Sequence, residues 1–398
     1  MKVIIAGKND IAVNVTSWLR DNFQEVEVLA VFNKSDDGKN THQRSFKNYC
    51  LKNKIQEISL DVAYEIEDSI FLSLEFDRIV KPEKFIHKRL FNIHFSKLPQ
   101  YKGMYTSAWP ILNNEKESGV TLHMIDAGID TGAILDQFIF SIDEDETAKS
   151  LYLKYIANGT RLVLKNIPSI INNTFSVQDQ KSEGSSYYSK SSIDYKKITI
   201  DLNKTAFEIL SQINAFTFRD FQLPEVYGFS IFGGSILSSR SSGKPGQILQ
   251  DSFNKIVVST IDYDLELKKD NLQTIFDICE KGTFHDLIKI EATKKSLIEK
   301  NDKGWSPIIV AAYHGNIDMV RWLVGNGADI NDRNHNGTTV AMYLKNFIAE
   351  SRRFELLDDL VDMGADLNLQ DYSGLTVFDY VLNSHDEELI NELKRLSK

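Results

Sequence analysis

The first 180 residues alternate between short apolar runs and longer segments in which apolar residues recur every three or four positions. The short runs have the length of buried β-strands, and the longer segments have the spacing of amphipathic helices. The predicted strands span residues 2–7, 26–32, 69–76, 90–95, 120–125 and 133–142, and the predicted helices span 10–22 and 147–172. This alternation favours an α/β fold in which helices cover both faces of a mostly parallel sheet.

A serine-rich connection, residues 181–198, leads into a second and shorter region. Here one helical segment, residues 204–216, precedes short β-like runs at 229–232, 246–249 and 255–260. The pattern predicts a small β-rich region before residue 270.

From about residue 271 the chain repeats itself. Gly304, Gly337 and Gly374 begin equivalent segments, and the sequence Gly-Ala-Asp recurs at Gly327 and Gly364. This pattern is typical of ankyrin repeats, all-α units that bury their apolar faces only against neighbouring units. We therefore predict three regions, residues 1–185, 186–269 and 270–398, of which the last is an ankyrin repeat domain with a degenerate first unit at 271–300.

The composition is that of a soluble globular protein, with 42% hydrophobic and 26% charged residues. A formal net charge of −10 argues against a nucleic-acid substrate. The apolar runs are far shorter than the roughly 20 residues that cross a bilayer. Cys50 and Cys279 lie far apart and have no metal-ligand partners at short spacing. We therefore expect a cytoplasmic protein without a membrane span, a disulfide or a structural metal.

A strand followed by a rigid turn carries the first candidate site. Asn92 and His94 are two residues apart, so both side chains leave the same face of the predicted strand. Pro99 and Gly103 then end the strand at its carboxyl end, where open α/β sheets bind their ligands. Taken alone, such a pair of polar residues is also typical of a hydrogen-bonded pair without function.

A second candidate segment spans residues 123–132. Gly128 and Gly132 flank Asp130, and glycines allow a carboxylate-bearing loop to pass close to a ligand. Asp130 alone would be an ordinary turn carboxylate, so its significance depends on the Asn92–His94 pair.

The two segments together resemble the folate-dependent formyltransferases, a family that includes transformylases of glycinamide ribonucleotide and of methionyl-tRNA and the nucleotide-sugar N-formyltransferases. The resemblance covers about residues 1–180 and implies a Rossmann-like formyltransferase core that uses N10-formyltetrahydrofolate and no metal. It implies that His94 is the general base or proton shuttle, helped by an unperturbed pKa of about 6.5. Asn92 would donate to the developing oxyanion, and Asp130 would orient His94 or relay protons.

The same resemblance implies a site for the pterin of the folate. It would be formed by two short loops, made of Phe76, Asp77, Arg78 and Ile79 in one and Asp126, Ala127, Gly128 and Ile129 in the other.

The regions beyond residue 180 narrow the choice of acceptor. The tRNA transformylases carry a basic C-terminal barrel, and the glycinamide ribonucleotide enzymes lack a counterpart of residues 199–269. The remaining resemblance is to nucleotide-sugar N-formyltransferases, with Phe221 stacked on the pyrimidine. The further candidates for acceptor binding are Lys102, Met104, Tyr105 and Trp109.

A nucleotide-sugar formyltransferase region followed by ankyrin repeats resembles enzymes that act on dTDP-3-amino-3,6-dideoxy-D-glucose. The resemblance implies that the product supplies precursors of O-antigen or another surface polysaccharide, as in lipopolysaccharide biosynthesis. A 4-amino sugar or a galacto-configured dTDP-sugar remains an alternative. We also expect a homodimer, formed through the 199–269 region.

Three roles for the ankyrin repeats remain open: binding a protein partner, a structural or dimer-supporting role, and a second nucleotide site. The third depends on Trp305, expected to be exposed in a turn, with Tyr313 and His314 nearby. A rival for the whole chain is a degenerate formyltransferase that serves as a binding scaffold. The joint presence of Asn92 and His94 with Asp130 argues against that rival.

Overall fold

The computed structural model describes residues 1–294 and 296–396, and the chain divides into two compact units. The first unit contains residues 1–39 and 43–269, and the second contains residues 40–42 and the chain from residue 270 onward. Residues 295, 397 and 398 fall in the predicted ankyrin domain but lie outside the described residues. The predicted boundary near residue 185, inside the first unit, stays a prediction.

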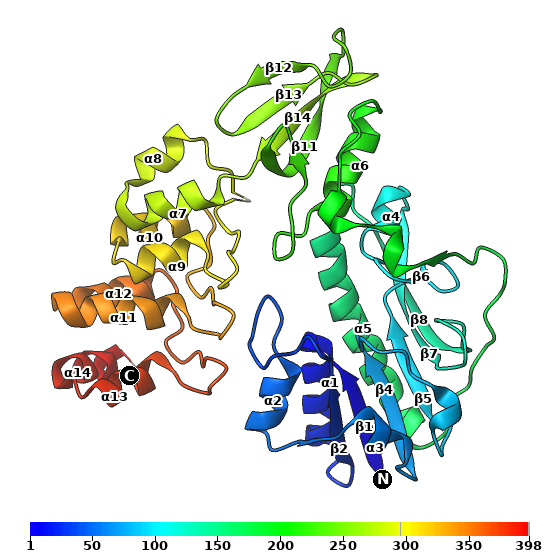
Figure 1. Cartoon of the computed structure of the whole chain (residues 1–398). Helices are drawn as coiled ribbons and strands as arrows, with labels where there is room; N and C mark the ends of the chain where they lie inside the picture. Colours follow the sequence, from blue (N-terminus) through cyan, green and yellow to red (C-terminus); the bar gives the residue numbers. More distant parts are fainter. Residues whose placement is uncertain (295, 397–398) are drawn as a thin grey trace. The chain divides into compact units, whose positions relative to one another are not determined.

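A twisted sheet forms the centre of the first unit (Figure 1). In spatial order its strands are β3 (Gln56–Glu57), β2 (Glu27–Phe32), β1 (Lys2–Gly7), β4 (Ser69–Leu74), β5 (Leu90–His94), β7 (Glu117–Met124) and β8 (Ile134–Ser141). The pairs from β3 to β5 are parallel, and the pairs of β7 with β5 and with β8 are antiparallel. The predicted mostly parallel α/β sheet is confirmed.

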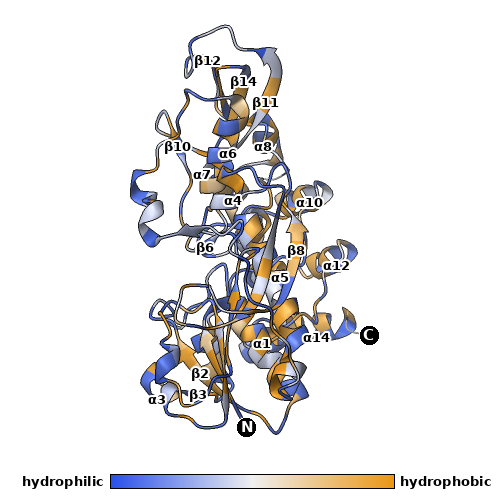
Figure 2. Ribbon diagram, turned by 90° about the vertical axis from the view of Figure 1, so that its right-hand side faces the viewer, coloured by the Kyte–Doolittle hydropathy of each residue, from blue (hydrophilic) through white to orange (hydrophobic). Residues whose placement is uncertain are grey.

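Helices cover both faces of this sheet, as the alternation of segments predicts. Helices α1 (Asn9–Asn22), α2 (Phe46–Lys52) and α5 (Ala148–Ile171) bury their apolar sides in one core. The other face is covered by α3 (Leu60–Tyr64) and the segment around Phe85. Figure 2 shows the strands of the sheet largely in the colour of hydrophobic residues. A sheet buried on both faces exposes its ligand-binding groups only at its ends.

The serine-rich connection is more structured than its composition indicates. Within it, β9 (Tyr187–Tyr188) pairs in parallel with β6 (Lys102–Gly103), which follows β5 in the chain. The 3₁₀-helices η2 (Lys190–Ser192) and η3 (Tyr195–Lys197) complete this segment, and η1 (Pro82–Lys84) lies between β4 and β5. The connection therefore helps to build the loop beyond β5.

The 199–269 region is β-rich, as expected. Its antiparallel sheet has the order β10 (Glu225–Val226), β11 (Phe229–Arg240), β14 (Tyr263–Lys269), β13 (Lys255–Val258) and β12 (Ile248–Asp251). Helix α6 (Ala206–Phe216) packs on it and begins at a capping box formed by Thr205 and Glu208. Strand β14 was not predicted, although Leu265 and Leu267 alternate with acidic residues there.

The second unit consists of helices in antiparallel pairs, and the ankyrin prediction is confirmed (Figure 1). The pairs are α7 (Leu272–Lys281) with α8 (Phe284–Lys289), α9 (Pro307–Tyr313) with α10 (Ile317–Gly325), α11 (Val340–Ser351) with α12 (Glu355–Asp362), and α13 (Val377–Ser384) with α14 (Glu387–Leu396). Gly304, Gly337 and Gly374 all have positive φ, which the turn before each pair requires. Across the described residues, no helix combines the length and apolarity needed to span a membrane.

Candidate active site

Strand β5 brings the first two candidate residues to the carboxyl end of the sheet. Asn92 and His94 lie on the same face of β5, as predicted, and Asn92 is opposite His123 of the antiparallel neighbour β7. His94 is 8% exposed and Asn92 is half-buried. Because β7 continues into the loop that carries Asp130, the pairing of β5 with β7 assembles the site.

Asp130 is the centre of this cluster. Its Oδ2 accepts a hydrogen bond from the backbone N–H of Gly103 at 2.9 Å and lies 3.4 Å from Nδ1 of His94. Its Oδ1 lies 3.4 Å from the amide nitrogen of Asn92 and 3.7 Å from Nε2 of His123. Asp130 itself has φ of 53°, a left-handed conformation that aspartate tolerates better than most residues. The predicted trio of Asn92, His94 and Asp130 is thus brought together.

The hydrogen bonds of His94 define its tautomer. Nε2 of His94 lies 2.8 Å from the carbonyl oxygen of Tyr101, which can only accept, so Nε2 carries hydrogen. In the neutral ring, Nδ1 then has the lone pair, and it faces the carboxylate of Asp130. A proton taken up at Nδ1 would therefore be stabilised by that carboxylate at once.

The electrostatics favour His94 as a base. Burial lowers the pKa of His94 below its usual value, while the Asp130 carboxylate and the Tyr101 carbonyl oppose that decrease. Burial alone would raise the pKa of Asp130, but His94 and the N–H of Gly103 hold it well below its usual range. At neutral pH the site therefore combines a neutral imidazole with an ionised carboxylate, as removal of a proton from an attacking amine requires.

His123 takes part in the cluster although no sequence pattern indicated a role for it. Its Nδ1 donates to the carbonyl oxygen of Met124 at 2.8 Å, so its Nε2 is free to accept from the amide of Asn92 at 3.0 Å. That bond fixes which end of the Asn92 amide is the donor. The sequence predicts the strand that contains His123, but no local pattern gives the register of that strand with β5.

An aromatic stack supports the loop that holds the Tyr101 carbonyl. The ring of Tyr188 lies between Tyr101, at 5.7 Å, and Trp109, at 4.2 Å. Asn113 donates to the hydroxyl groups of both tyrosines, at 3.1 and 3.2 Å. Trp109 begins α4 (Trp109–Leu112). Trp109 therefore helps to support the loop that orients His94, and its predicted place in the sugar site stays a prediction.

The two loops predicted to hold the pterin lie on the same side of the sheet. Phe76 and Ile125, which directly precedes the second loop, both pack against the core that α3 covers. The guanidinium of Arg78 lies 4.6 Å from the ring centre of Phe76, and Ile79 is 77% exposed. In the second loop, Asp126 accepts from Gly128 and Thr131, which shapes the turn. These contacts leave exposed apolar and backbone groups for a planar ligand; the assignment stays a prediction.

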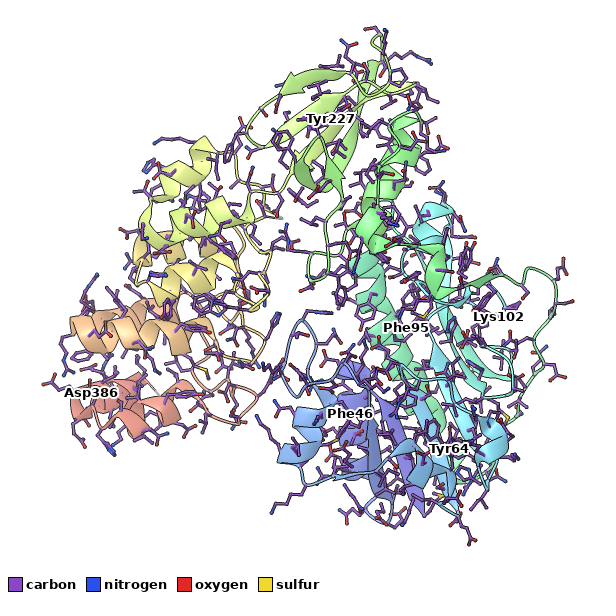
Figure 3. The ribbon with its side chains drawn as sticks, in the orientation of Figure 1. Phe46, Tyr64, Phe95, Lys102, Tyr227 and Asp386 are labelled. Carbon is purple, nitrogen blue, oxygen red and sulfur yellow. The ribbon has the colours of Figure 1, made fainter. Side chains whose placement is uncertain are left out.

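The predicted acceptor residues occupy two places. Lys102 donates to Ser185 at 3.2 Å, and Tyr105 donates to the carbonyl oxygen of Lys190 at 2.9 Å. Lys102, which Figure 3 labels, lies in β6, and Tyr105 and the exposed Met104 lie in the segment that follows β6. Phe221 lies elsewhere, after α6, with 67% of its surface exposed and its ring 4.7 Å from Phe218. Their joint role in binding stays a prediction.

The ankyrin candidates do form a cluster, but the expected exposure of Trp305 is wrong. Trp305 is half-buried, because its ring packs against Tyr313 at 5.0 Å and Tyr343 at 5.1 Å. Tyr313 is 47% exposed, and its ring lies 5.0 Å from that of the exposed His314. Tyr343, from the next repeat, was not anticipated.

Comparison with known proteins defines the class. Residues 1–167 match the family described as formyl transferase, and residues 255–334 and 275–371 match ankyrin repeats. An N-formyltransferase from Helicobacter canadensis, in complex with folinic acid and dTDP-3-aminofucose, is 44% identical, with a TM-score of 0.63; the similarity covers 68% of this chain and 100% of that one. The chain therefore belongs to the formyltransferase family and is an N-formyltransferase.

Two further relatives are similar to this chain. WlaRD, a sugar 3N-formyl transferase solved with dTDP and 5-N-formyl-THF, is 43% identical, with a TM-score of 0.64, over 68% of this chain and 98% of that one. The bifunctional polymyxin resistance protein ArnA of Wigglesworthia glossinidia brevipalpis is 30% identical over 323 residues, which are 77% of this chain and 48% of ArnA. The chain thus spans about half the length of that relative.

Proposed function

We propose that this enzyme transfers the formyl group of N10-formyltetrahydrofolate to the 3-amino group of a dTDP-linked amino-dideoxysugar, namely dTDP-3-amino-3,6-dideoxy-D-glucose. The observation that carries the proposal is the cluster of Asn92, His94 and Asp130, in which a neutral imidazole lies 3.4 Å from an ionised carboxylate. The nucleotide and the position of the amino group are supported by the relatives solved with dTDP-3-aminofucose and with dTDP.

In this reaction the neutral amine attacks the formyl carbon, and the bond from that carbon to N10 of the folate breaks. Asn92 holds the developing oxyanion, which needs a donor at that position. His94 accepts the proton that the amine loses, and Asp130 balances the resulting positive charge. The proton then passes to the folate nitrogen as the leaving group departs.

The test is mass spectrometry of the products formed from N10-formyltetrahydrofolate and a panel of dTDP-amino-dideoxysugars. The panel contains 3-amino and 4-amino sugars in gluco and galacto configurations. We expect a gain of one formyl group on the 3-amino gluco sugar. Preference for the galacto epimer would change the assigned configuration of the sugar. No transfer to any member of the panel would contradict the proposal and favour the scaffold role.

We further propose that the product serves O-antigen or another surface polysaccharide and that the enzyme is a homodimer formed through the 199–269 region. The dimer is supported by an exposed edge strand, β12, with Ile248 and Leu249 42% and 44% exposed. Sedimentation equilibrium on the wild type and on Leu249→Lys tests it. A wild-type monomer would overturn the dimer.

For the ankyrin repeats we propose a second nucleotide site at Trp305, supported by its cluster with Tyr313 and Tyr343. Equilibrium dialysis with dTDP measures the stoichiometry. Trp305→Ala should lose one class of sites and retain turnover, whereas Trp322→Ala, a half-buried tryptophan elsewhere in the array, should lose none. Equal stoichiometry in the Trp305→Ala variant and the wild type would contradict the second nucleotide site. The ankyrin repeats would then be assigned to binding a protein partner or to a structural role.

A further inference from the structure

A cluster of polar residues occupies the point where the order of the sheet reverses. From β1 the chain proceeds to β2 on one side and later to β4 on the other, so the carboxyl ends of β1 and β4 flank the switch point. The last pair of these strands is Gly7 with Leu74, and Asn9 and Glu75 follow it closely. Open α/β sheets bind ligands in this crevice.

Three side chains are linked there by hydrogen bonds. The amide nitrogen of Asn9 donates to Oε2 of Glu75 at 3.1 Å and contacts the hydroxyl oxygen of Tyr152 at 2.8 Å. That hydroxyl donates to Glu75, with distances of 2.9 and 3.1 Å to the two carboxylate oxygens. Each of the three side chains is half-buried, so part of its surface still reaches solvent. Asn9 and Glu75 have φ of 65° and 59°, which turns them out of the regular strand and helix geometry.

Glu75 is unusual for a carboxyl group. Burial raises its pKa to about 7, although Lys8, Tyr152 and Asn9 counteract that increase and Asp10 adds to it. Asp10 is itself paired with Arg44. The Glu75 carboxyl therefore changes between donor and acceptor close to neutral pH.

The cluster also lies beside the catalytic strand. Leu74 pairs with Ile93, which places Glu75 one strand away from His94. The ring of Tyr152 lies 6.1 Å from that of Phe95, which follows His94 and which Figure 3 labels. On its other side Tyr152 lies 5.6 Å from Phe218.

Phe218 continues this line toward the nucleotide. Its ring lies 4.7 Å from Phe221, the residue proposed to stack on the base. A row of aromatic rings thus runs from Phe95, the residue that follows His94, through Tyr152, whose hydroxyl bonds to Glu75, and through Phe218 to Phe221, the proposed base-binding residue. Glu75 therefore lies beside the end of the strand that carries His94 and is linked through Tyr152 and Phe218 to Phe221, so an acceptor with its amine at His94 and its base at Phe221 would have its hexose near Glu75.

From this arrangement we propose that Glu75 and Asn9 bind the hydroxyl groups of the hexose of the acceptor and select its configuration, with Tyr152 holding the carboxyl in place. The inference rests on the proposed sugar-nucleotide substrate. Carboxyl and amide groups can each accept and donate to vicinal hydroxyl groups, and the hydroxyl of Tyr152 holds the Glu75 carboxyl in place for such contacts. None of the three residues is needed for the chemistry at the formyl carbon.

Steady-state kinetics of Glu75→Gln tests the assignment, with the panel member that the wild type formylates as substrate. The KM for the sugar nucleotide should rise roughly ten- to a hundredfold, the usual effect of losing a hydrogen bond to a charged group. The KM for the folate should stay unchanged, and the ratio of kcat/KM between the gluco and galacto sugars should move toward one. Glu57→Gln, an exposed carboxyl on β3, is the matched control and should match the wild type.

A binding measurement separates the hexose from the nucleotide. Calorimetric titration with dTDP alone should give the same affinity for the wild type and Glu75→Gln, while the affinity for the dTDP-amino sugar should fall in the variant. Wild-type affinity for the sugar nucleotide should increase as pH rises through the pKa of Glu75, because the ionised carboxylate is the stronger acceptor, and this dependence should vanish in Glu75→Gln.

Asn9→Gly is the second variant, because glycine accepts the positive φ and removes only the amide. If Glu75→Gln does not fold, Asn9→Gly carries the same test. An unchanged KM for the sugar in the folded variants, or an equal rise in the KM for the folate, would overturn the inference. Absence of formyl transfer by the wild type to every sugar would instead refute the proposed function.

Discussion

The cluster around Asp130 gathers side chains that are distant in the sequence, whereas the ankyrin array packs helices that follow one another. Asn92 reaches across 38 positions to Asp130, and Tyr101 reaches across 85 to Ser186. In the array, α9 packs against α7, α10 and α11, its close neighbours in the chain. Polar hydrogen bonds connect the side chains of the Asp130 cluster, whereas apolar contacts between neighbouring helices connect the ankyrin array.

This difference separates function from stability within one chain. Removing a polar group near Asp130 should change the reaction and leave the fold largely intact. Removing apolar volume from the array should lower the free energy of unfolding and leave the chemistry intact.

The largest effect is expected for His94→Gln. Loss of the base should reduce kcat by about 10² to 10⁴, the usual contribution of general acid–base catalysis. Circular dichroism should show an unchanged fold, and His385→Gln, at an exposed position in the array, should keep wild-type kcat. A kcat within a factor of about three of the wild type would remove His94 from the mechanism.

The matching change in the array is Leu323→Ala. Leu323 is 0% exposed in α10, so the substitution should destabilise the second unit by about 2–5 kcal/mol. Urea denaturation measures the free energy of unfolding, and kcat should stay at the wild-type value where the protein is folded. A fall in kcat as large as that of His94→Gln would break the separation between the two regions.

A smaller change is expected in the pH dependence. Only neutral His94 accepts the proton, so kcat at saturating acceptor should fall as pH decreases through the His94 pKa, below the ordinary value of about 6.5. Asp130 raises that pKa, so Asp130→Asn should move the acid limb to still lower pH and reduce the maximum. A shift toward higher pH would show that Asp130 does not support the imidazolium.

The smallest effect is expected at a helix start in the array. The side chain of Thr339 accepts from the N–H of Met342, so Thr339→Ala should cost about 1 kcal/mol. Thr339→Ser retains the hydroxyl and should stay close to the wild type in thermal unfolding. Equal destabilisation by both substitutions would assign the effect to the lost methyl group instead.

Much of the fold could be predicted from the sequence, because periodicity reports burial directly. The grouping of Asn92, His94 and Asp130 was predicted from the resemblance to the formyltransferases, because neither the Asn92–His94 pair nor Asp130 alone indicated a site. The ankyrin units repeat with the same turns. The distance in sequence from Gly337 to Gly374 is longer than that from Gly304 to Gly337, and α11 between them is correspondingly longer than α9.

The remaining parts depend on register and on long-range packing. The place of His123 follows from the pairing of β5 with β7, and no local pattern specifies it. Tyr188 lies in a serine-rich stretch that composition assigns to a linker, yet it stacks on Trp109. Glu75 looks like an ordinary residue at a strand end until Tyr152, from a distant helix, bonds to it. The burial of Trp305 likewise depends on Tyr343 of the next repeat.

The pairing of β6 with β9 has a consequence for the synthesis of the protein. The family match ends at residue 167, but the carbonyl that orients His94 belongs to a loop tied to residues 186–188. A chain that ends at residue 167 would contain Asn92, His94 and Asp130 and still lack the segment that closes the loop beside them. On the ribosome, the proposed active centre can therefore mature only after the connection has emerged, well after its own residues have been translated.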